Sequence, residues 1–324
     1  IYYNQTHPYA ADKGRILDRN RFVMTNTIDL YANYNRKIGE NFELGAMVGH
    51  SFLKTRSRTS YIDAQNYPSP AFDVASVAAN IVDASAGLSE YAIESYFARL
   101  SLAYKDRYVV NATIRTDGSS RFAANDRWGF FPSASVGWRI SEEPFMAGAK
   151  SWLDNLKIRA SFGSTGNGQV DNYLFLSKIA IKKNLGFLTG DSPLIYADKP
   201  SLIPDGLTWE TVSTYDLGLD WEMLNGRLSI VADIYRKNTT DMYVVGPELP
   251  AVFGNSAPKG NYADMRTDGW EASISWRDNF KLGGKDFSYN LKFAIWDNVT
   301  KVTKYMATTN TLPTNYATNY YEGM

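Results

Sequence analysis

Ten charged side chains lie on one side of segments with two-residue alternation, and they are the residues best able to take part in binding or proton chemistry. Side chains two apart on a strand share a face, so a run of such positions charges one face of a sheet. Earlier segments turn basic groups to that face and later segments turn acidic groups to it. The basic set is Arg99, Arg115, Arg139, Lys157 and Arg159, and the acidic set is Glu210, Asp216, Asp220, Asp233 and Glu271. Such groups either pair with one another or line a polar passage.

A second set of residues combines aromatic faces with amide and carboxylate side chains in the polar connections. Aromatic rings and Asn or Asp side chains suit sugar rings, which present C–H surfaces and hydroxyl rims. The same residues can equally stabilise loop packing or contact a protein partner. The candidates are Tyr61, Tyr67, Trp128, Asn167, Asp171 and Tyr173.

Covalent catalysis has little support in the sequence. Cysteine is absent, and His7 and His50 are the two histidines. The glycine-rich run over residues 163–168 has no lysine at the spacing of a phosphate-binding loop, and neither a zinc-protease nor a serine-hydrolase motif occurs. We therefore predict no catalytic residue, no metal site and no cofactor.

Composition excludes further classes of function. The 324 residues carry 34 basic and 34 acidic side chains, and this balance argues against binding of nucleic acid, which needs a basic excess. A membrane-spanning helix needs about 20 consecutive apolar residues, and polar residues interrupt every candidate stretch. Aromatic residues, at 14%, are unusually frequent.

Two-residue alternation of apolar and polar side chains dominates the chain and predicts an all-β, antiparallel fold. Each segment is near the ~9–11 residues with which a tilted strand crosses a bilayer. The ten predicted strands cover about residues 24–34, 42–52, 96–104, 108–114, 134–140, 156–162, 215–221, 228–234, 270–276 and 287–295.

Short and long connections alternate between these strands. Short turns are expected near residues 39–41, 105–107, 224–226 and 278–286, and long loops over 55–89, 118–131, 164–206 and 242–261. One longer short-side link, residues 141–155, is expected to hold a helical turn around Phe145–Leu153. An outer-membrane β-barrel has this alternation, with short turns in the periplasm and long loops outside. A soluble β-sandwich remains the alternative from alternation alone.

Aromatic residues on the apolar faces gather near the short-turn ends of the strands. A barrel places an interfacial aromatic girdle there, whereas a sandwich would use the same residues as core. The residues concerned are Tyr104, Tyr108, Trp138, Trp221, Trp276 and Phe287.

Two stretches resemble the SusC/RagA-type TonB-dependent outer-membrane transporters. The first is DGSSRFAANDRWGFFPS over residues 117–133, continued by the tryptophan and ISEEPF of residues 138–145. The second is LKIRASFGSTGN over residues 156–167, followed in order by LTWET at 207–211, YDLGL at 215–219, LNGRL at 224–228, DIY at 233–235 and GWE at 269–271. The resemblance covers roughly residues 90–297.

The resemblance implies an antiparallel transmembrane β-barrel in the outer membrane of a Gram-negative bacterium, in contact with its lipid. Family members close a 22-stranded, plugged barrel, so residues 1–324 are expected to form an interior part of the barrel domain. The plug domain, the TonB-contacting segment and the final strands are expected to lie outside this chain. The charged face would then line the lumen, where its groups pair with the plug or with one another, or form a water-accessible track for substrate.

The function implied is TonB-energised import of oligosaccharides, or of peptides, with a SusD-like surface lipoprotein as partner. TonB would act through the plug. Two alternatives stay open: a SusC-like barrel that serves as a structural subunit of a larger outer-membrane assembly, and a passive porin.

Overall fold

The computed structural model describes residues 2–3, 14–69, 71–72, 74–182, 188–189, 192–193, 196–246, 249–306, 311–312, 320–321 and 323. Ten long strands dominate the chain, and four 3-10 turns and short strands occupy the connections. The long strands are β2 (Arg15–Ile38), β3 (Phe42–Gln65), β4 (Asn80–Tyr104), β5 (Tyr108–Ser119), β6 (Trp128–Arg139), β7 (Leu153–Asn167), β12 (Glu210–Met223), β13 (Leu228–Val245), β14 (Lys259–Leu282) and β15 (Lys285–Tyr305).

The remaining elements are short. They are β1 (Tyr2–Tyr3), β8 (Ile181–Lys182), β9 (Leu188–Thr189), β10 (Ser192–Pro193), β11 (Tyr196–Ala197), β16 (Thr311–Leu312) and β17 (Tyr320–Tyr321), with the 3-10 turns η1 (Ala75–Val77), η2 (Ile140–Glu142), η3 (Pro144–Ala149) and η4 (Ala251–Phe253). No helix in the described ranges is long and apolar enough to cross a membrane.

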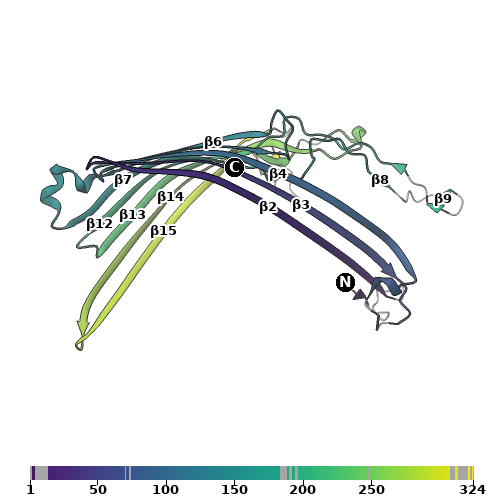
Figure 1. Ribbon diagram of the computed structural model, residues 1–324, viewed down its shortest axis with the longest axis horizontal. Coiled ribbons are helices and arrows are strands. Elements are labelled where there is room, and N and C mark those ends of the chain that lie inside the picture. The colour runs from purple at the N-terminus through teal and green to yellow at the C-terminus, as the bar shows by residue number, and fades with distance from the viewer. Residues whose placement is uncertain are drawn as a thin grey trace. The chain divides into compact units, whose positions relative to one another are not determined.

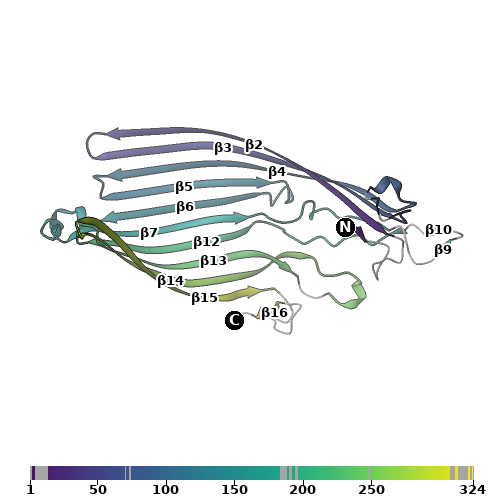
Figure 2. The same cartoon turned by 90° about the horizontal axis from the view of Figure 1, so that it is seen from below.

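One sheet contains the ten long strands together with β1. Its strand order follows the chain, from β1 to β7 and then from β12 to β15. The pairs from β5 to β15 are antiparallel, and Figure 2 shows these strands side by side in sequence order. β14 and β15 run together along their whole length in Figure 1. All ten predicted strands are therefore present, and the predicted antiparallel β class is confirmed.

The chain divides into two compact units. The first comprises residues 1–28 and 51–93, and the second comprises residues 29–50 and 94–324. The first unit has a small core of Ile16, Ala64 and Tyr67, and Arg15 pairs with Asp63 beside it. The second unit holds the paired strands β5 to β15 and a larger core.

Several of the predicted connections are longer than those in the structure. The loop expected over residues 55–89 is confined to residues 66–79, because β3 continues to Gln65 and β4 begins at Asn80. Polar side chains support these extensions: Thr25 and Thr55 hydroxyls lie 3.0 Å apart and Arg56 pairs with Glu90 at 3.2 Å. A strand with polar residues on both faces loses the alternation by which it could be recognised. The connection expected at 278–286 is likewise a tight turn at Gly283 and Gly284.

Exposed apolar side chains follow one face of the second unit's sheet. On β5, exposed Tyr108, Val110 and Ile114 alternate with partly covered Val109 and Thr113. The strand registers align one row of this apolar face across six strands: Trp138, Ile158, Leu219, Ala232, Ala272 and Ile295. Leu219 and Ile274, on β12 and β14, share this face instead of meeting across an enclosed core.

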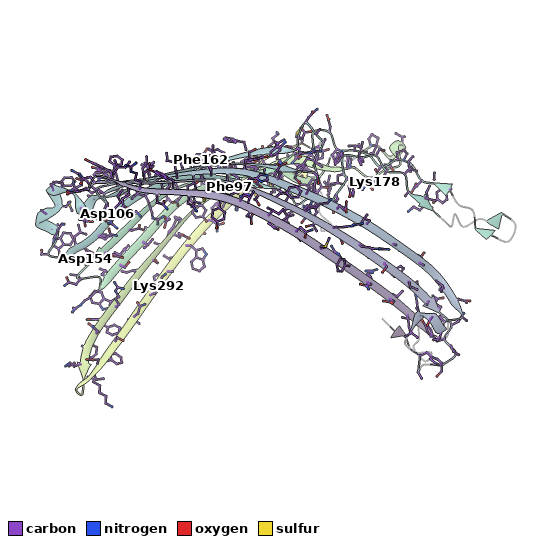
Figure 3. The ribbon with its side chains drawn as sticks, in the orientation of Figure 1. Phe97, Asp106, Asp154, Phe162, Lys178 and Lys292 are labelled. Atoms are coloured by element: carbon purple, nitrogen blue, oxygen red, sulfur yellow. The ribbon has the colours of Figure 1, made fainter. Side chains whose placement is uncertain are left out.

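Aromatic rings form a ladder at the short-turn end of the apolar face. The ring centroids of Phe42 and Tyr104 lie 4.9 Å apart, those of Tyr104 and Tyr108 6.4 Å, and those of Tyr108 and Trp138 6.5 Å. In Figure 3, Asp106 and Asp154 mark this end and Lys178 lies in the long connection at the opposite end. The structure thus places these four rings where the sequence predicted a girdle.

Glu143 ties the ladder to the link between β6 and β7. Its side chain is largely buried and accepts hydrogen bonds from the Tyr108 hydroxyl and, at 3.1 Å, from the Trp138 indole, while Arg107 lies 3.4 Å from its other oxygen. These donors, the Tyr108 hydroxyl first, hold the pKa of the Glu143 carboxyl below its usual value. The link holds η2 and η3 where a helical turn was predicted.

We predict that Glu143→Gln destabilises the barrel most above pH 5 and least in acid. A depressed pKa means that the ionised carboxylate stabilises the fold above the usual glutamate pKa of about 4.3, and that this stabilisation is lost as the pH falls through the lowered value. Thermal unfolding midpoints of both proteins between pH 8 and 3 test this. Glu142→Gln, at an exposed side chain 3.4 Å from Lys150, is the matched control and should change little. A gap between wild type and Glu143→Gln that persists undiminished to pH 3 would contradict the assignment.

Candidate functional site

The charged residues predicted from the sequence lie on the face opposite the apolar one, which we call the polar face. Across β7, β12, β13, β14 and β15 one register row of this face reads Arg159, Gly218, Asp233, Glu271 and Trp296. The next row places Lys157 opposite Asp220. The basic and the acidic sector therefore meet at the pairing of β7 with β12.

Arg159 is the centre of the charged cluster. Its Nε donates to Asp220 Oδ1 at 3.1 Å, its Nη2 lies 2.7 Å from Asp233 Oδ1 and 2.8 Å from Oδ2, and its Nη1 lies 3.6 Å from Asp216. Three carboxylates share one guanidinium, and Glu271 is the register neighbour of Asp233. The fixed fork of arginine suits such multiple contacts better than a lysine would.

Gly218 allows the guanidinium to cross β12. A Cβ built there would lie 2.5 Å from Arg159 Cζ, and it would also overlap Asp233 Oδ1. Asp233 lies one strand beyond β12, and it is buried because the guanidinium covers it. The glycine in the YDLGL stretch is thus explained by the ion cluster that lies over it.

The other basic residues make fewer ionic contacts than Arg159. Arg115 binds Asp117 at 2.8 Å and the Ser95 hydroxyl at 3.1 Å, and Arg139 binds Asp106 at 2.7 Å at the short-turn end. Arg99 is exposed and makes one long contact, 3.4 Å, to the Thr113 hydroxyl.

A shallow groove of about 540 Å³ runs beside Arg99 on the polar face. Small hydroxyl side chains cover its floor because β5, β6 and β7 alternate them with the apolar residues of the other face. The residues that line it include Asn111, Thr113, Ser133, Ser135 and Ser161. Serine and threonine hydroxyls both donate and accept hydrogen bonds, so this floor suits a polar, hydroxyl- or amide-bearing ligand.

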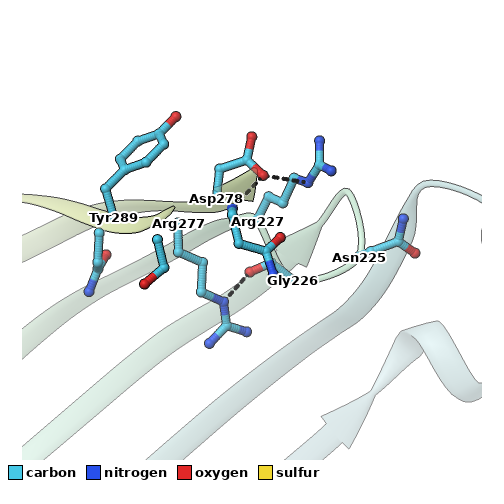
Figure 4. A pocket seen from close by; sticks show the side chains of 9 residues that line it. Asn225, Gly226, Arg227, Arg277, Asp278 and Tyr289 are labelled. Carbon is cyan, nitrogen blue, oxygen red and sulfur yellow. Dashed lines mark hydrogen bonds and ion pairs between the residues drawn. The ribbon is translucent and has the colours of Figure 1, made fainter. Parts of the chain in front are cut away.

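A second hollow, of about 750 Å³, lies at the short-turn end (Figure 4). There the Arg277 Nε donates to the Gly226 carbonyl at 2.5 Å, and Arg227 pairs with Asp278 at 3.3 Å. Asp154 accepts from the Gly226 amide at 2.7 Å. These contacts hold the β12–β13 turn in place. The residues that line the hollow therefore stabilise the turn, and none of them is a predicted site residue.

The long connections are joined by an aromatic core that the sequence did not predict. Phe122, Phe131, Val170, Leu207 and Trp209 are buried together, with Leu174 and Tyr243 against them. The Trp209 indole donates to the Arg127 carbonyl at 2.9 Å, and Arg121 binds the Asn172 side chain at 3.0 Å. The DGSSRF, RWGFF and LTWE stretches supply most of this core, which is the signal that could have revealed it.

The loop candidates have separate surroundings. Tyr67 is buried in the core of the first unit, and Tyr61, on strand β3 instead of a loop, lies under Arg19 and donates to Asp63 at 3.4 Å. Trp128 begins β6 and is 49% exposed on the apolar face beside Tyr96.

Of the remaining three, Asn167 is the last residue of β7, and Asp171 and Tyr173 lie in the connection that follows it. Asn167 donates to Glu210 at 3.3 Å and accepts from the Gln169 amide, Asp171 is exposed, and the Tyr173 ring lies under Lys178. The structure therefore brings none of the six loop candidates together into one site, and their contact with substrate stays a prediction. Within the described part of the chain, no group of three His, Asp or Glu side chains is placed to hold a metal ion.

The comparisons with known proteins decide the family. The model described as "TonB dependent receptor-like, beta-barrel" matches residues 1–323. The chain belongs to this family. Curated relatives include TonB-dependent receptor P3 of Formosa agariphila, 29% identical over 86% of this chain and 27% of the relative. TonB-dependent receptor SusC of Bacteroides thetaiotaomicron is 28% identical over 89% of this chain and 28% of its own length.

Among solved structures, one titled "Structure of the RagAB peptide transporter" matches with a TM-score of 0.83 at 23% identity, covering 98% of this chain and 34% of that one. The predicted SusC/RagA type is confirmed, and the chain is an outer-membrane β-barrel protein of a Gram-negative bacterium. It spans about a quarter of the length of the curated relatives it matches. An outer-membrane barrel turns an apolar face to lipid and a polar face to its interior.

Removal of the central cation tests the charged cluster. We predict that Arg159→Met destabilises the barrel by about 1–3 kcal/mol, less than for a fully buried pair, because the guanidinium is about a third exposed and leaves three carboxylates facing one another. Thermal unfolding of the folded barrel measures the loss. Adding Asp233→Asn and Asp220→Asn to Arg159→Met should recover part of the stability. A triple variant that is less stable than Arg159→Met would contradict the cluster as described.

Two glycines of β7 offer a matched test of the aromatic core. We predict that Gly166→Ala destabilises by about 1–3 kcal/mol, because its Cβ would overlap the Phe131 ring, whereas a Cβ at Gly163 meets Ser133 at an ordinary 3.8 Å. Gly163→Ala is therefore the control and should unfold near the wild-type temperature. The smaller side chain of Phe131→Leu should rescue Gly166→Ala in part. Equal effects of the two alanine variants would show that the Phe131 contact is unimportant.

Proposed function

We propose that this chain forms part of the wall of a TonB-energised outer-membrane importer of oligosaccharides or peptides that works with a SusD-like surface lipoprotein. The observation that carries the proposal is the similarity of nearly the whole chain to proteins of the SusC and RagA kind. SusC and the RagAB peptide transporter are relatives by family and fold, and their cargo is ascribed to them, not to this chain.

The polar face supports the same proposal. A lumen wall of hydroxyl side chains with one exposed arginine gives a polar cargo repeated weak hydrogen bonds and no deep pocket in which it would be trapped. Binding sites along a path must be strong enough to admit a ligand and weak enough to release it. The groove beside Arg99 has this character.

Substrate uptake by the complete protein that carries this chain tests the proposal. We predict uptake of neutral oligosaccharides or of peptides that requires an energised TonB system and a co-expressed SusD-like lipoprotein. Arg99→Glu should lower the rate of uptake severalfold. It should not lower the amount of folded barrel, because Arg99 is exposed and makes only one long hydrogen bond. Lys105→Glu, the same charge reversal in a short-side turn, is the control and should leave uptake unchanged.

Each alternative has its own outcome. Uptake that persists without TonB would indicate a passive porin. Absence of uptake for both classes of cargo, with co-purification of other outer-membrane assembly components, would indicate a structural subunit. Either result would overturn the proposed importer.

A further inference from the structure

The first unit contains parts of three neighbouring strands of the sheet. They are residues 15–28 of β2, 51–65 of β3 and 80–93 of β4. The Thr25 and Thr55 hydroxyls lie 3.0 Å apart, so the odd-numbered positions of β2 and β3 share a face. The Arg56–Glu90 pair places the even-numbered positions of β3 and β4 together on the other side. The odd-numbered positions of these three segments therefore form one face, which we call the odd face.

Two arginines stand side by side on the odd face. Arg19 and Arg21 are exposed, and neither pairs with an acidic group among the residues that the structure describes. The Arg19 guanidinium lies 5.5 Å from the centroid of the Tyr61 ring, and the Arg21 Nε donates to the Ser57 hydroxyl at 3.2 Å. Because a guanidinium carries five N–H donors, both arginines keep terminal N–H groups for a further acceptor.

The acidic residues of the odd face leave the charge of the two arginines uncompensated. Asp63 is buried, and its Oδ1 accepts a hydrogen bond from Arg15 at 2.8 Å. Asp83 is exposed and lies on β4, two strand spacings of about 4.8 Å from β2. Positive charge therefore predominates around the two arginines.

The floor beside the arginines is polar and open. Ser57 and Thr59 on β3 and Ser85 on β4 occupy odd-numbered positions, and their hydroxyls can both donate and accept hydrogen bonds. A Cβ added at Gly87, also on β4, would meet no heavy atom within 4 Å, so the space above this glycine is open. A ligand on this floor can therefore reach hydroxyl groups and the two guanidiniums together.

We propose that Arg19 and Arg21 bind a side-chain carboxylate of a peptide. Side chains two apart on a strand are separated by about 7 Å, so a carboxylate between the two guanidiniums can accept hydrogen bonds from both. Because this assignment rests on the proposed importer, it narrows the cargo of that importer to acidic peptides. A peptide is favoured over an oligosaccharide because Arg19 occupies a face of Tyr61 on which a sugar ring would stack.

Two double variants of the complete protein, purified in detergent, test the carboxylate site. Arg19→Gln with Arg21→Gln removes the two cations of the odd face. Lys54→Gln with Arg58→Gln is the control, because it removes the same charge from exposed, even-numbered positions of β3 on the opposite face of the same sheet.

Three probes that carry the same dye are titrated into each protein, and binding is followed by fluorescence anisotropy. The first is a hexapeptide amide of glycine, serine and two glutamates. The second has glutamine in place of both glutamates, and the third is trigalacturonate, which presents carboxylates on sugar rings. Comparison of the first two probes isolates the carboxylate, and comparison of the first and third isolates the peptide.

We expect the Arg19/Arg21 variant to bind the acidic peptide about tenfold more weakly than the wild type at low salt, and the difference to shrink as salt is added. The Lys54/Arg58 variant should bind the acidic peptide like the wild type, and the glutamine peptide should bind all three proteins equally weakly. Equal losses in the two variants, or wild-type binding that is the same for both peptides, would overturn the proposal. Tighter binding of trigalacturonate than of the acidic peptide would show that the peptide assignment is wrong.

A single variant keeps the test decisive if the Arg19/Arg21 variant does not fold. Arg21→Gln removes one exposed contact, to Ser57, and should cost little stability. It should weaken binding of the acidic peptide about threefold, and an unchanged affinity would overturn the proposal.

Uptake by cells separates failure of this site from failure of the importer. TonB-dependent uptake of a peptide or oligosaccharide, together with acidic-peptide binding that does not depend on the two arginines, would overturn the site alone. Absence of uptake for every cargo, with arginine-dependent binding of the acidic peptide intact, would overturn the importer and support the site.

Discussion

Every backbone amide and carbonyl inside hydrocarbon must find a partner within the protein, because an unpaired group there costs several kcal/mol. The pairing of successive strands from β5 to β15 meets this requirement without a long crossover, since each strand bonds to the neighbours that flank it in the sheet. Backbone pairing uses up the polar groups of the main chain. The two faces of the sheet then differ only in their side chains, which is why two-residue alternation predicts one apolar face and one charged face.

Much of this fold could be predicted from the sequence because the bilayer enforces a strict pattern. All ten strands were recognisable where one side must be apolar, as on β5 or β13. The pattern is weaker in the extensions of β3 to Gln65 and of β4 from Asn80, where polar residues occur on both sides and the sequence predicts a loop. Ion pairs and threonine contacts hold them, and such contacts depend on register, which a sequence does not display.

The sequence predicts which strands carry the basic and which the acidic residues of the candidate site, but it does not predict the contacts between them. The two-residue alternation of each strand predicts that Arg159, Asp220 and Asp233 lie on one face. It could not show that one guanidinium would reach across a strand to join them, because that depends on the empty space above Gly218. Trp128 and Tyr67 illustrate a second limit: polar surroundings in the sequence suggested exposed binding rings, yet one lies on the apolar face and the other in a core. Burial of an aromatic ring also depends on partners that are distant in the sequence, here Ile16 for Tyr67.

The aromatic core around Phe131 and Trp209 determines which parts of the long connections are held in place. It joins the bases of the connections after β5 and β7 and contacts Tyr243 near the end of β13. The core contacts of these connections come mostly from residues close to the strands. A substitution farther along the connection after β7, for example at Lys178, therefore removes none of them.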